Sequence, residues 1–156
     1  MVFTWHDYNP EKMGYVENWL DANAVATTGI DEGFRSFYEY WVNEDGFILG
    51  QNFWCKIVCA DNEPLAVVAL NMYEEKVTVM EIVVAPEKRG HGLGSRILKE
   101  LMQNEQILGF TISTSEAAIY TNNMASQKAF KNAGFRHART HEDGDTLYYI
   151  YEKDHK

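Results

Sequence analysis

The chain has 156 residues, of which 46% are hydrophobic and 24% charged, and its formal net charge is −9. The length fits one domain, residues 1–156, and the apolar content is sufficient for a folded core, which excludes a wholly disordered chain. The acidic balance argues against a nucleic-acid partner, and the chain lacks both an apolar run of roughly 18 residues and an N-terminal basic region followed by an apolar core, so we expect neither membrane insertion nor secretion.

The N-terminal third reads as one strand followed by two helices. Val2–Tyr8 has the β-branched and aromatic composition of a strand. We expect Glu11–Asn23 to be helical, with a break at Thr27–Gly29. Asp31 then has the position of an N-cap for a second helix that extends to about Asn43.

Aromatic side chains form a stripe along this second helix. They recur at i, i+3, i+4 and i+7, the spacing of one helical face: Phe34, Phe37, Tyr38 and Trp41. Packing into the protein core is the simpler interpretation of the stripe, and a wall of a substrate site is the alternative.

The middle of the chain is expected to form three strands, Phe53–Ala60, Pro64–Tyr73 and Lys76–Ala85, of which the first two form a hairpin. Cys55 and Cys59 lie in the first strand. Four residues of strand span roughly 13 Å, more than the ~7 Å between Cα atoms that a disulfide tolerates. Because free thiols suit a reducing compartment, we expect a cytoplasmic protein.

The C-terminal half alternates helices and strands. The expected elements are a helix over residues 92–104, a strand Phe110–Thr114, a helix Asn123–Ala133 and a hairpin of Arg136–Thr140 with Thr146–Glu152. Gly134 follows the second helix in the left-handed C′ position that glycine favours. The fold class is therefore α/β, with antiparallel hairpins at both ends and helices between them.

The most informative segment is the glycine-rich turn after the third of these strands. Gly90, Gly92 and Gly94 let backbone N–H groups crowd around one point, and a helix N-terminus adds about half a positive charge there. The basic residues around the turn are Lys88, Arg89, Arg96 and Lys99. This combination predicts an anion site suited to a pyrophosphate. A dinucleotide fingerprint would require glycine where Ser95 stands, and the Gly-Lys-Ser/Thr of a Walker A loop is absent.

Two motifs in this half of the chain resemble a known family. The run Arg89-Gly90-His91-Gly92-Leu93-Gly94 resembles the R/Q-x-x-G-x-G/A signature of the GNAT superfamily of acyl-CoA-dependent N-acyltransferases. Downstream, Asn123, Ser126, Phe130 and Gly134-Phe135 resemble the family's N-x-x-(small)-x-x-x-Y-x-x-x-G-F helix. Together the motifs cover about residues 77–135. The resemblance implies a mixed, mostly antiparallel central sheet flanked by helices and splayed after its central strand.

The resemblance also implies acetyl-CoA as the co-substrate. Backbone groups of Ile82, Val83 and Val84, beside a bulge in the central strand, would pair with the pantetheine arm, and Asn123 would contact the pantetheine or the thioester. The cofactor site would further include the N–H groups of Arg89, Gly90, His91, Gly92, Leu93 and Gly94 around the pyrophosphate, together with Ser95 and Phe130. The alternative for the His91 side chain is a solvent-facing position in the turn.

In the implied reaction a primary amine attacks the acetyl thioester directly after losing a proton, since an alkylamine has a pKa near 10. Glu81 is the candidate base, because a charge within the apolar central strand is costly unless it has a purpose. A carboxylate that faces solvent or pairs with a lysine is the alternative. A backbone N–H near Val83 would stabilise the oxyanion.

The chain departs from the family pattern at Phe130, which stands where a tyrosine protonates the leaving thiolate. A phenyl ring cannot donate a proton. Thiols have a pKa of about 8.5, so water can take over this role, and the alternative donor is the hydroxyl of Tyr120, or that of Tyr148 or Tyr149. We expect no metal site, because no histidine has metal-ligand spacing with cysteines or carboxylates: His6, His137, His141 and His155.

Acidic residues concentrate in one half of the chain. Residues 1–75 carry 13 acidic and 3 basic side chains, a net charge of −10, whereas residues 76–156 carry 10 and 11, a net charge of +1. The first half also holds 14 of the 21 aromatic residues. Carboxylates and rings attract a cationic amine, which favours a polyamine, an amino-sugar or a peptide amine as the acceptor. Solvation of helix surfaces is the alternative explanation of these acidic residues.

The function predicted from the sequence is therefore N-acetylation of a primary amine by acetyl-CoA. A non-enzymatic acyl-CoA-binding or regulatory module of the same fold is the main alternative, and Phe130 is the residue that favours it. A nucleotide-binding protein that uses the glycine turn is a weaker one. From the resemblance we expect a homodimer.

Overall fold

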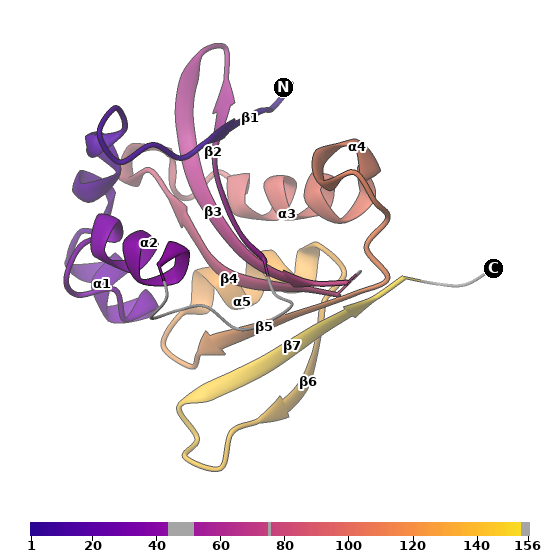
Figure 1. Ribbon diagram of the computed structural model, residues 1–156. Coiled ribbons are helices and arrows are strands. Elements are labelled where there is room, and N and C mark those ends of the chain that lie inside the picture. Colours follow the sequence, from indigo (N-terminus) through magenta and orange to yellow (C-terminus); the bar gives the residue numbers. More distant parts are fainter. Residues whose placement is uncertain (44–51, 75, 154–156) are drawn as a thin grey trace.

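The computed structural model describes residues 1–43, 52–74 and 76–153. Seven strands form one sheet in the order β1-β2-β3-β4-β5-β7-β6 (Figure 1). Their bounds are β1 Thr4–Asp7, β2 Asn52–Ala60, β3 Glu63–Tyr73, β4 Lys76–Val84, β5 Thr114–Tyr120, β6 Arg136–Thr140 and β7 Thr146–Glu152. Every neighbouring pair is antiparallel except β4 and β5, which run parallel. The mixed, mostly antiparallel sheet predicted from the sequence is confirmed.

Helices flank both faces of this sheet (Figure 1). The N-terminal helices precede β2, and the others follow β4 and β5. Their bounds are η1 Gly14–Trp19, α1 Ala22–Thr28, α2 Phe34–Val42, η3 Pro86–Lys88, α3 Leu93–Gln103, α4 Glu105–Leu108 and α5 Met124–Asn132, where η denotes a short 3₁₀ helix. None of the helices in the described part of the chain is long and apolar enough to cross a membrane.

The two faces of the sheet carry separate hydrophobic clusters. On one face, side chains of α3 and α5 such as Ile97 and Phe130 pack against the sheet. On the other face, η1 and α2 contribute Val16, Trp19 and Phe34 to a second cluster. Because strand side chains alternate between faces, the continuous apolar run of β3 supplies both clusters.

β4 and β5 separate part of the way along the sheet. Their pairing joins Lys76–Val79 to Thr114–Ala117, whereas β4 continues to Val84 and β5 to Tyr120. The second half of β4 is therefore paired with β3 alone, and its other edge faces a gap. This confirms the splay after the central strand that the sequence predicted.

A β-bulge lies at the point where the strands separate. Ala69 of β3 pairs with Glu81, but the next residue, Leu70, pairs with Val79, so Met80 has no opposite residue. An extra residue of this kind changes the direction in which neighbouring side chains point. Ala69 belongs to the cluster on the η1–α2 face, so its directly paired neighbour Glu81 faces the same side.

The prediction of one helix over Glu11–Asn23 is wrong, because the segment divides into η1 and α1. The Asp21 carboxylate accepts a 2.9 Å hydrogen bond from the Ala24 N–H and thereby starts a new helix. α1 runs through Thr28, whose hydroxyl donates to the Ala24 carbonyl. The helix ends at Gly29, which has a φ of +78°. Of the predicted break at Thr27–Gly29, only Gly29 interrupts the helix, because Thr27 and Thr28 are still helical.

Asp31 is not the N-cap of α2. The helix begins at Phe34 after Gly33, and its cap comes from a residue in another element. The two carboxylate oxygens of Glu17, in η1, accept hydrogen bonds of 2.7 and 2.8 Å from the N–H groups of Phe34 and Arg35. A carboxylate here also interacts favourably with the helix dipole.

The strand predicted at Phe110–Thr114 is also wrong. The strand is β5, Thr114–Tyr120, in which Ser115, Ala117 and Ile119 are buried and the residues between them are not. The short helix α4 was not predicted; its N-cap is the Asn104 side chain. The other predicted strands, the helix at residues 92–104, Gly134 with a φ of +99°, and the buried free thiols of β2 are confirmed.

Candidate active site

The glycine turn leads directly into α3. Gly90 and Gly92 have φ values of +83° and +74°, in the left-handed region that favours glycine. Gly92 occupies the N-cap position of α3, and no side chain in the described part of the chain caps this helix. The first N–H groups of α3, which have no partner within the helix, are therefore available to an anion.

A cavity of about 300 Å³ lies beside this turn; we call it the glycine-turn cavity. It is bounded by the end of β4, the turn, and the facing sides of α1 and α5. The lining includes ten of the predicted cofactor residues, namely Ile82, Val83, Val84, Arg89, Gly90, Gly92, Leu93, Gly94, Ser95 and Asn123. His91 is exposed and does not line the cavity, which matches the solvent-facing alternative.

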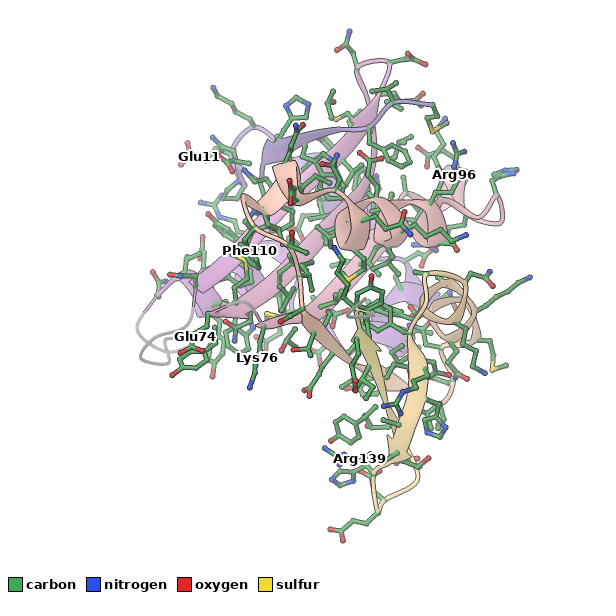
Figure 2. The ribbon with its side chains drawn as sticks, turned by 90° about the vertical axis from the view of Figure 1, so that its right-hand side faces the viewer. Glu11, Glu74, Lys76, Arg96, Phe110 and Arg139 are labelled. Carbon is green, nitrogen blue, oxygen red and sulfur yellow. The ribbon has the colours of Figure 1, made fainter. Side chains whose placement is uncertain are left out.

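The basic residues at the cavity differ in part from those predicted. Lys88 lines it and also pairs with Glu63 at 2.9 Å. Arg96 and Lys99 do not line it: they border an open hollow on the outer side of α3. Figure 2 shows Arg96 beside this helix, and its guanidinium lies 5.9 Å from the centre of the Phe3 ring. Both side chains project sideways from α3, whereas its first N–H groups point along the helix axis.

Lys128 of α5 lines the glycine-turn cavity and was missed in the sequence. Because Lys128 is far from the glycine turn along the chain, the sequence pattern around the turn did not include it. The available signal was its position in the second motif, five residues after Asn123, on a helix already expected to border the cofactor.

The Arg89 side chain does not point to an anion. Its guanidinium donates hydrogen bonds of 3.0 Å to the Val84 carbonyl, 2.9 Å to the Trp19 carbonyl and 2.8 Å to the Asp21 carboxylate. The N–H of Ala24 and then Arg89 lower the pKa of the Asp21 carboxyl. Arg89 thus joins the glycine turn to the start of α1.

The other end of α1 is held by the connection between β5 and α5. The Asn122 amide donates to the Ala26 carbonyl at 3.1 Å, and the Asn123 amide donates to the Thr27 carbonyl at 3.4 Å. Asn123 also caps α5 by accepting a bond from the Ser126 N–H. α1 is therefore fixed at both ends by segments that line the glycine-turn cavity, and it forms one wall of that cavity.

A second cavity, of about 330 Å³, lies in the gap between β4 and β5; we call it the strand-gap cavity. Residues of α1, α2 and α5 complete its walls. The residues that line both cavities are Thr27, Thr28, Ile82, Asn123 and Ser126. The two spaces are therefore adjacent, and a molecule with its phosphates at the glycine turn can extend into the strand gap.

Glu81 lines the strand-gap cavity and is partly buried. Burial raises the pKa of its carboxyl from 4.5 to about 8, because loss of water disfavours the charged form. A carboxyl that titrates close to neutral pH is suited to accept a proton from a substrate.

Tyr120 and Phe130 line the same cavity. A Cβ at Gly29 would lie 2.9 Å from Tyr120 Oη, so the hydroxyl lies beside the end of α1. Phe130 is 3% exposed, and its ring meets Phe135 edge-to-face with centroids 4.9 Å apart. Tyr148, one of the alternative proton donors, lies on β7 outside both cavities. So does Tyr149, which is 1% exposed.

The aromatic side chains of α2 contribute both to the protein core and to the wall of a cavity. Phe34 is fully buried in the core, and Phe37 and Tyr38 pack against the same cluster. Phe37 and Trp41 also line the strand-gap cavity. In the described part of the chain, no cluster of three or more histidine, cysteine, aspartate or glutamate side chains is arranged to hold a metal ion.

Several solved structures with the same fold are acetyltransferases of very low sequence identity to this chain. Aminoglycoside acetyltransferase AAC(6')-Ib in complex with coenzyme A and kanamycin has a TM-score of 0.73 and 14% identity, and the alignment covers 97% of this chain and 95% of the other. Spermidine N-acetyltransferase from Vibrio cholerae, in complex with CoA and spermine, has a TM-score of 0.72 and 12% identity, with 96% and 95% covered.

A third such structure is the ribosomal-protein-S18-alanine N-acetyltransferase from Escherichia coli, with a TM-score of 0.67, 13% identity and coverage of 99% and 96%. No curated protein matches the chain in sequence. The profile of the acetyltransferase (GNAT) family matches residues 6–135. This range includes both motifs and the strands β4 and β5, whose residues line the cavities. The chain therefore belongs to the GNAT acetyltransferase family.

Proposed function

We propose that this protein is an N-acetyltransferase that moves an acetyl group from acetyl-CoA to a primary amine by direct attack. The observation that carries the proposal is that the two cavities are adjacent: the glycine-turn cavity continues into the strand-gap cavity, which Glu81 lines. The enzymes of the same fold that were crystallised with coenzyme A support this choice of co-substrate.

Three groups of backbone atoms fit acetyl-CoA. The uncapped N–H groups at the start of α3 suit the pyrophosphate. The edge of β4 from Ile82 to Val84 faces the gap without a partner strand, so its amides can pair with those of the pantetheine arm. A backbone N–H near Val83 would stabilise the oxyanion that forms at the acetyl carbonyl.

Glu81 takes the proton of the acceptor ammonium, directly or through a water. The amine nitrogen then attacks the thioester carbonyl carbon, the C–S bond breaks, and coenzyme A leaves as a thiolate, while the new amide nitrogen releases its remaining extra proton to water. Tyr120, the cavity residue with an ionisable hydroxyl, protonates the thiolate or orients a water that does so. Phe130 presents only a ring to this cavity.

The acceptor is a primary amine, for which the sequence suggests a polyamine, an amino-sugar or a peptide amine as candidates. The kanamycin, spermine and ribosomal-protein enzymes of the same fold span these three classes. We also propose that residues 1–156 act as one cytoplasmic domain, since the two cysteines are free thiols, and that it forms a homodimer.

Isothermal titration with acetyl-CoA, followed by a thiol-release assay on a panel of primary amines, tests the function. We expect binding at micromolar concentration and amine-dependent release of coenzyme A. Absence of binding would overturn the proposal. Binding without turnover on any amine would instead support an acyl-CoA-binding module, the alternative that Phe130 favours.

A further inference from the structure

We infer that the acceptor carries a single ammonium group next to an apolar or aromatic body, and that it is not a polycation. This inference rests on the proposed acetyl transfer and narrows it to one class of acceptor. It depends on the walls of the strand-gap cavity and on the positions of the acidic side chains of the N-terminal half.

The strand-gap cavity is walled mainly by apolar and aromatic side chains. Four aromatic residues supply the rings: Phe37 and Trp41 of α2, Tyr120 of β5 and Phe130 of α5. Among the described residues that line it, Glu81 is the one carboxylate, and there is no lysine, arginine or histidine. The remaining polar groups are neutral hydroxyls and one amide: Thr27, Thr28, Thr78, Ser126 and Asn123.

The acidic side chains that the structure describes in the N-terminal half do not gather at this cavity. Five of them serve elsewhere: Asp7 pairs with Lys56, Glu39 with Arg35, Glu63 with Lys88, Glu17 caps α2, and Asp21 caps α1 and binds Arg89. The others described are exposed and do not line it: Glu11, Asp31, Glu32, Asp61 and Glu74. Glu44, Asp45 and Glu75 lie outside the described residues. The ten acidic side chains that the structure describes in this half therefore give no geometric support to the idea that it draws a cation to the site.

A polycation would be poorly matched to such walls. Each ammonium group taken out of water needs a carboxylate or several carbonyls, because an unpaired buried charge is very costly. The described walls offer one carboxylate, next to the expected position of the thioester. A second or third ammonium would therefore lie against aromatic or aliphatic groups without a counter-charge.

A monoamine with an apolar body matches the same walls. Its ammonium can reach Glu81 and the face of a ring, and its body can displace water from Phe37 and Trp41. Phe53 of β2 contacts both of these rings. Its ring stacks on that of Trp41, with centroids 6.4 Å apart and 14° between the ring planes, and its centroid lies 6.2 Å from that of Phe37. The aromatic wall is thus formed before the acceptor binds.

Steady-state kcat/KM at saturating acetyl-CoA for three amines tests the inference. 2-Phenylethylamine has one charge and an aromatic body, glucosamine one charge and a polar ring, and spermidine several charges. We expect 2-phenylethylamine to exceed each of the others at least about tenfold, the scale on which a shaped apolar pocket discriminates. A higher kcat/KM for spermidine or glucosamine would overturn the inference but leave acetyl transfer intact. If no amine is acetylated, the proposed function itself is wrong.

Substitutions in α2 test whether Trp41 is responsible for the preference for an amine with an apolar body. Trp41→Ala should raise KM for 2-phenylethylamine at least about tenfold and leave methylamine, which has no body to bind, within about twofold. Trp41→Phe should retain most of the preference. Its activity would show that a substitution at this position does not unfold the protein. Val42→Ala, at an exposed neighbour outside the cavity, is the matched control. An equal loss for both amines in Trp41→Ala and Trp41→Phe would contradict a role of Trp41 in selectivity.

Discussion

The guanidinium of Arg89 donates a 2.8 Å hydrogen bond to the carboxylate of Asp21, a residue 68 positions earlier in the chain. Asp21 starts α1 by capping it, and Arg89 belongs to the glycine turn. The pair therefore connects the wall formed by α1 to the proposed pyrophosphate site. The motif arginine contributes its backbone to the turn, while its side chain holds another element in position.

Arg89→Ala should lower the free energy of unfolding by about 1–3 kcal/mol, since three hydrogen bonds from a charged donor are lost. It should also weaken acetyl-CoA binding, because α1 is no longer held against the turn. Chemical denaturation and titration calorimetry measure the two effects. Arg136→Ala breaks an exposed pair with Glu152 far from the site and should cost less than about 1 kcal/mol without changing acetyl-CoA affinity. Equal effects of the two substitutions would contradict the role given to Arg89.

Lys128→Ala should weaken acetyl-CoA binding by up to about fivefold at low salt, the affinity equivalent of about 1 kcal/mol for an exposed charge. The loss should shrink as salt is added. Lys99→Ala is the control, because Lys99 borders the outer hollow of α3 and not the glycine-turn cavity. If Lys99→Ala weakened binding as much as Lys128→Ala, the assignment of the anion site to this cavity would be wrong.

Glu17→Ala should destabilise the protein by about 1–2 kcal/mol, the cost of losing a helix N-cap. The substitution leaves the N–H groups of Phe34 and Arg35 without their carboxylate acceptor. Asp31→Ala should be neutral to within about 0.5 kcal/mol, since Asp31 is exposed and does not cap α2. Urea unfolding of both variants provides the comparison, and a larger loss in Asp31→Ala would contradict the observed cap.

The pH dependence of kcat/KM should follow Glu81. The carboxylate forms as the pH rises through about 8, so kcat/KM should increase as the pH rises through that value. Glu81→Gln should lower kcat/KM by about 100-fold or more and move the optimum upward, because the reaction then requires the free amine. Glu116→Gln, at an exposed carboxylate of β5 outside the strand-gap cavity, should keep the wild-type profile.

The same carboxyl affects stability in a defined direction. Its pKa of about 8 in the folded state exceeds the value of 4.5 expected after unfolding, so between these pH values the folded state binds more protons. The stabilisation is complete below about pH 4.5 and is lost as the pH rises through 8. Glu81→Gln should remove this part of the decline, measured as melting temperature against pH. An unchanged decline would show that Glu81 is not desolvated.

Tyr120→Phe should lower kcat at least about tenfold, less than usual for a general acid because a coenzyme A thiolate is a fair leaving group. Acetyl-CoA affinity should stay within about twofold, since Tyr120 does not line the glycine-turn cavity. Tyr148→Phe, on β7 outside both cavities, is the control. An unchanged kcat in Tyr120→Phe would indicate that water, without Tyr120, protonates the leaving thiolate.

The sequence alone determined the features that depend on neighbours along the chain. Period-2 and period-3.6 patterns placed most strands, together with α3 and α5, and Gly134 marked the end of α5 because few other residues adopt its backbone conformation. The spacing of Gly90, Gly92 and Gly94 predicted an anion site at this turn, since consecutive backbone N–H groups can create one without distant partners.

Only the tertiary structure decided which distant groups meet. Glu17 caps a helix that begins 17 residues later, Arg89 binds Asp21 across 68 residues, and Lys128 faces a turn from another helix. The excess of negative charge in the N-terminal half likewise gave no indication that its carboxylates would cap helices and pair with cations away from the strand-gap cavity. Local patterns fix backbone conformation within a turn or two, whereas charge pairing and cavity walls depend on side chains brought together by packing of the whole sheet.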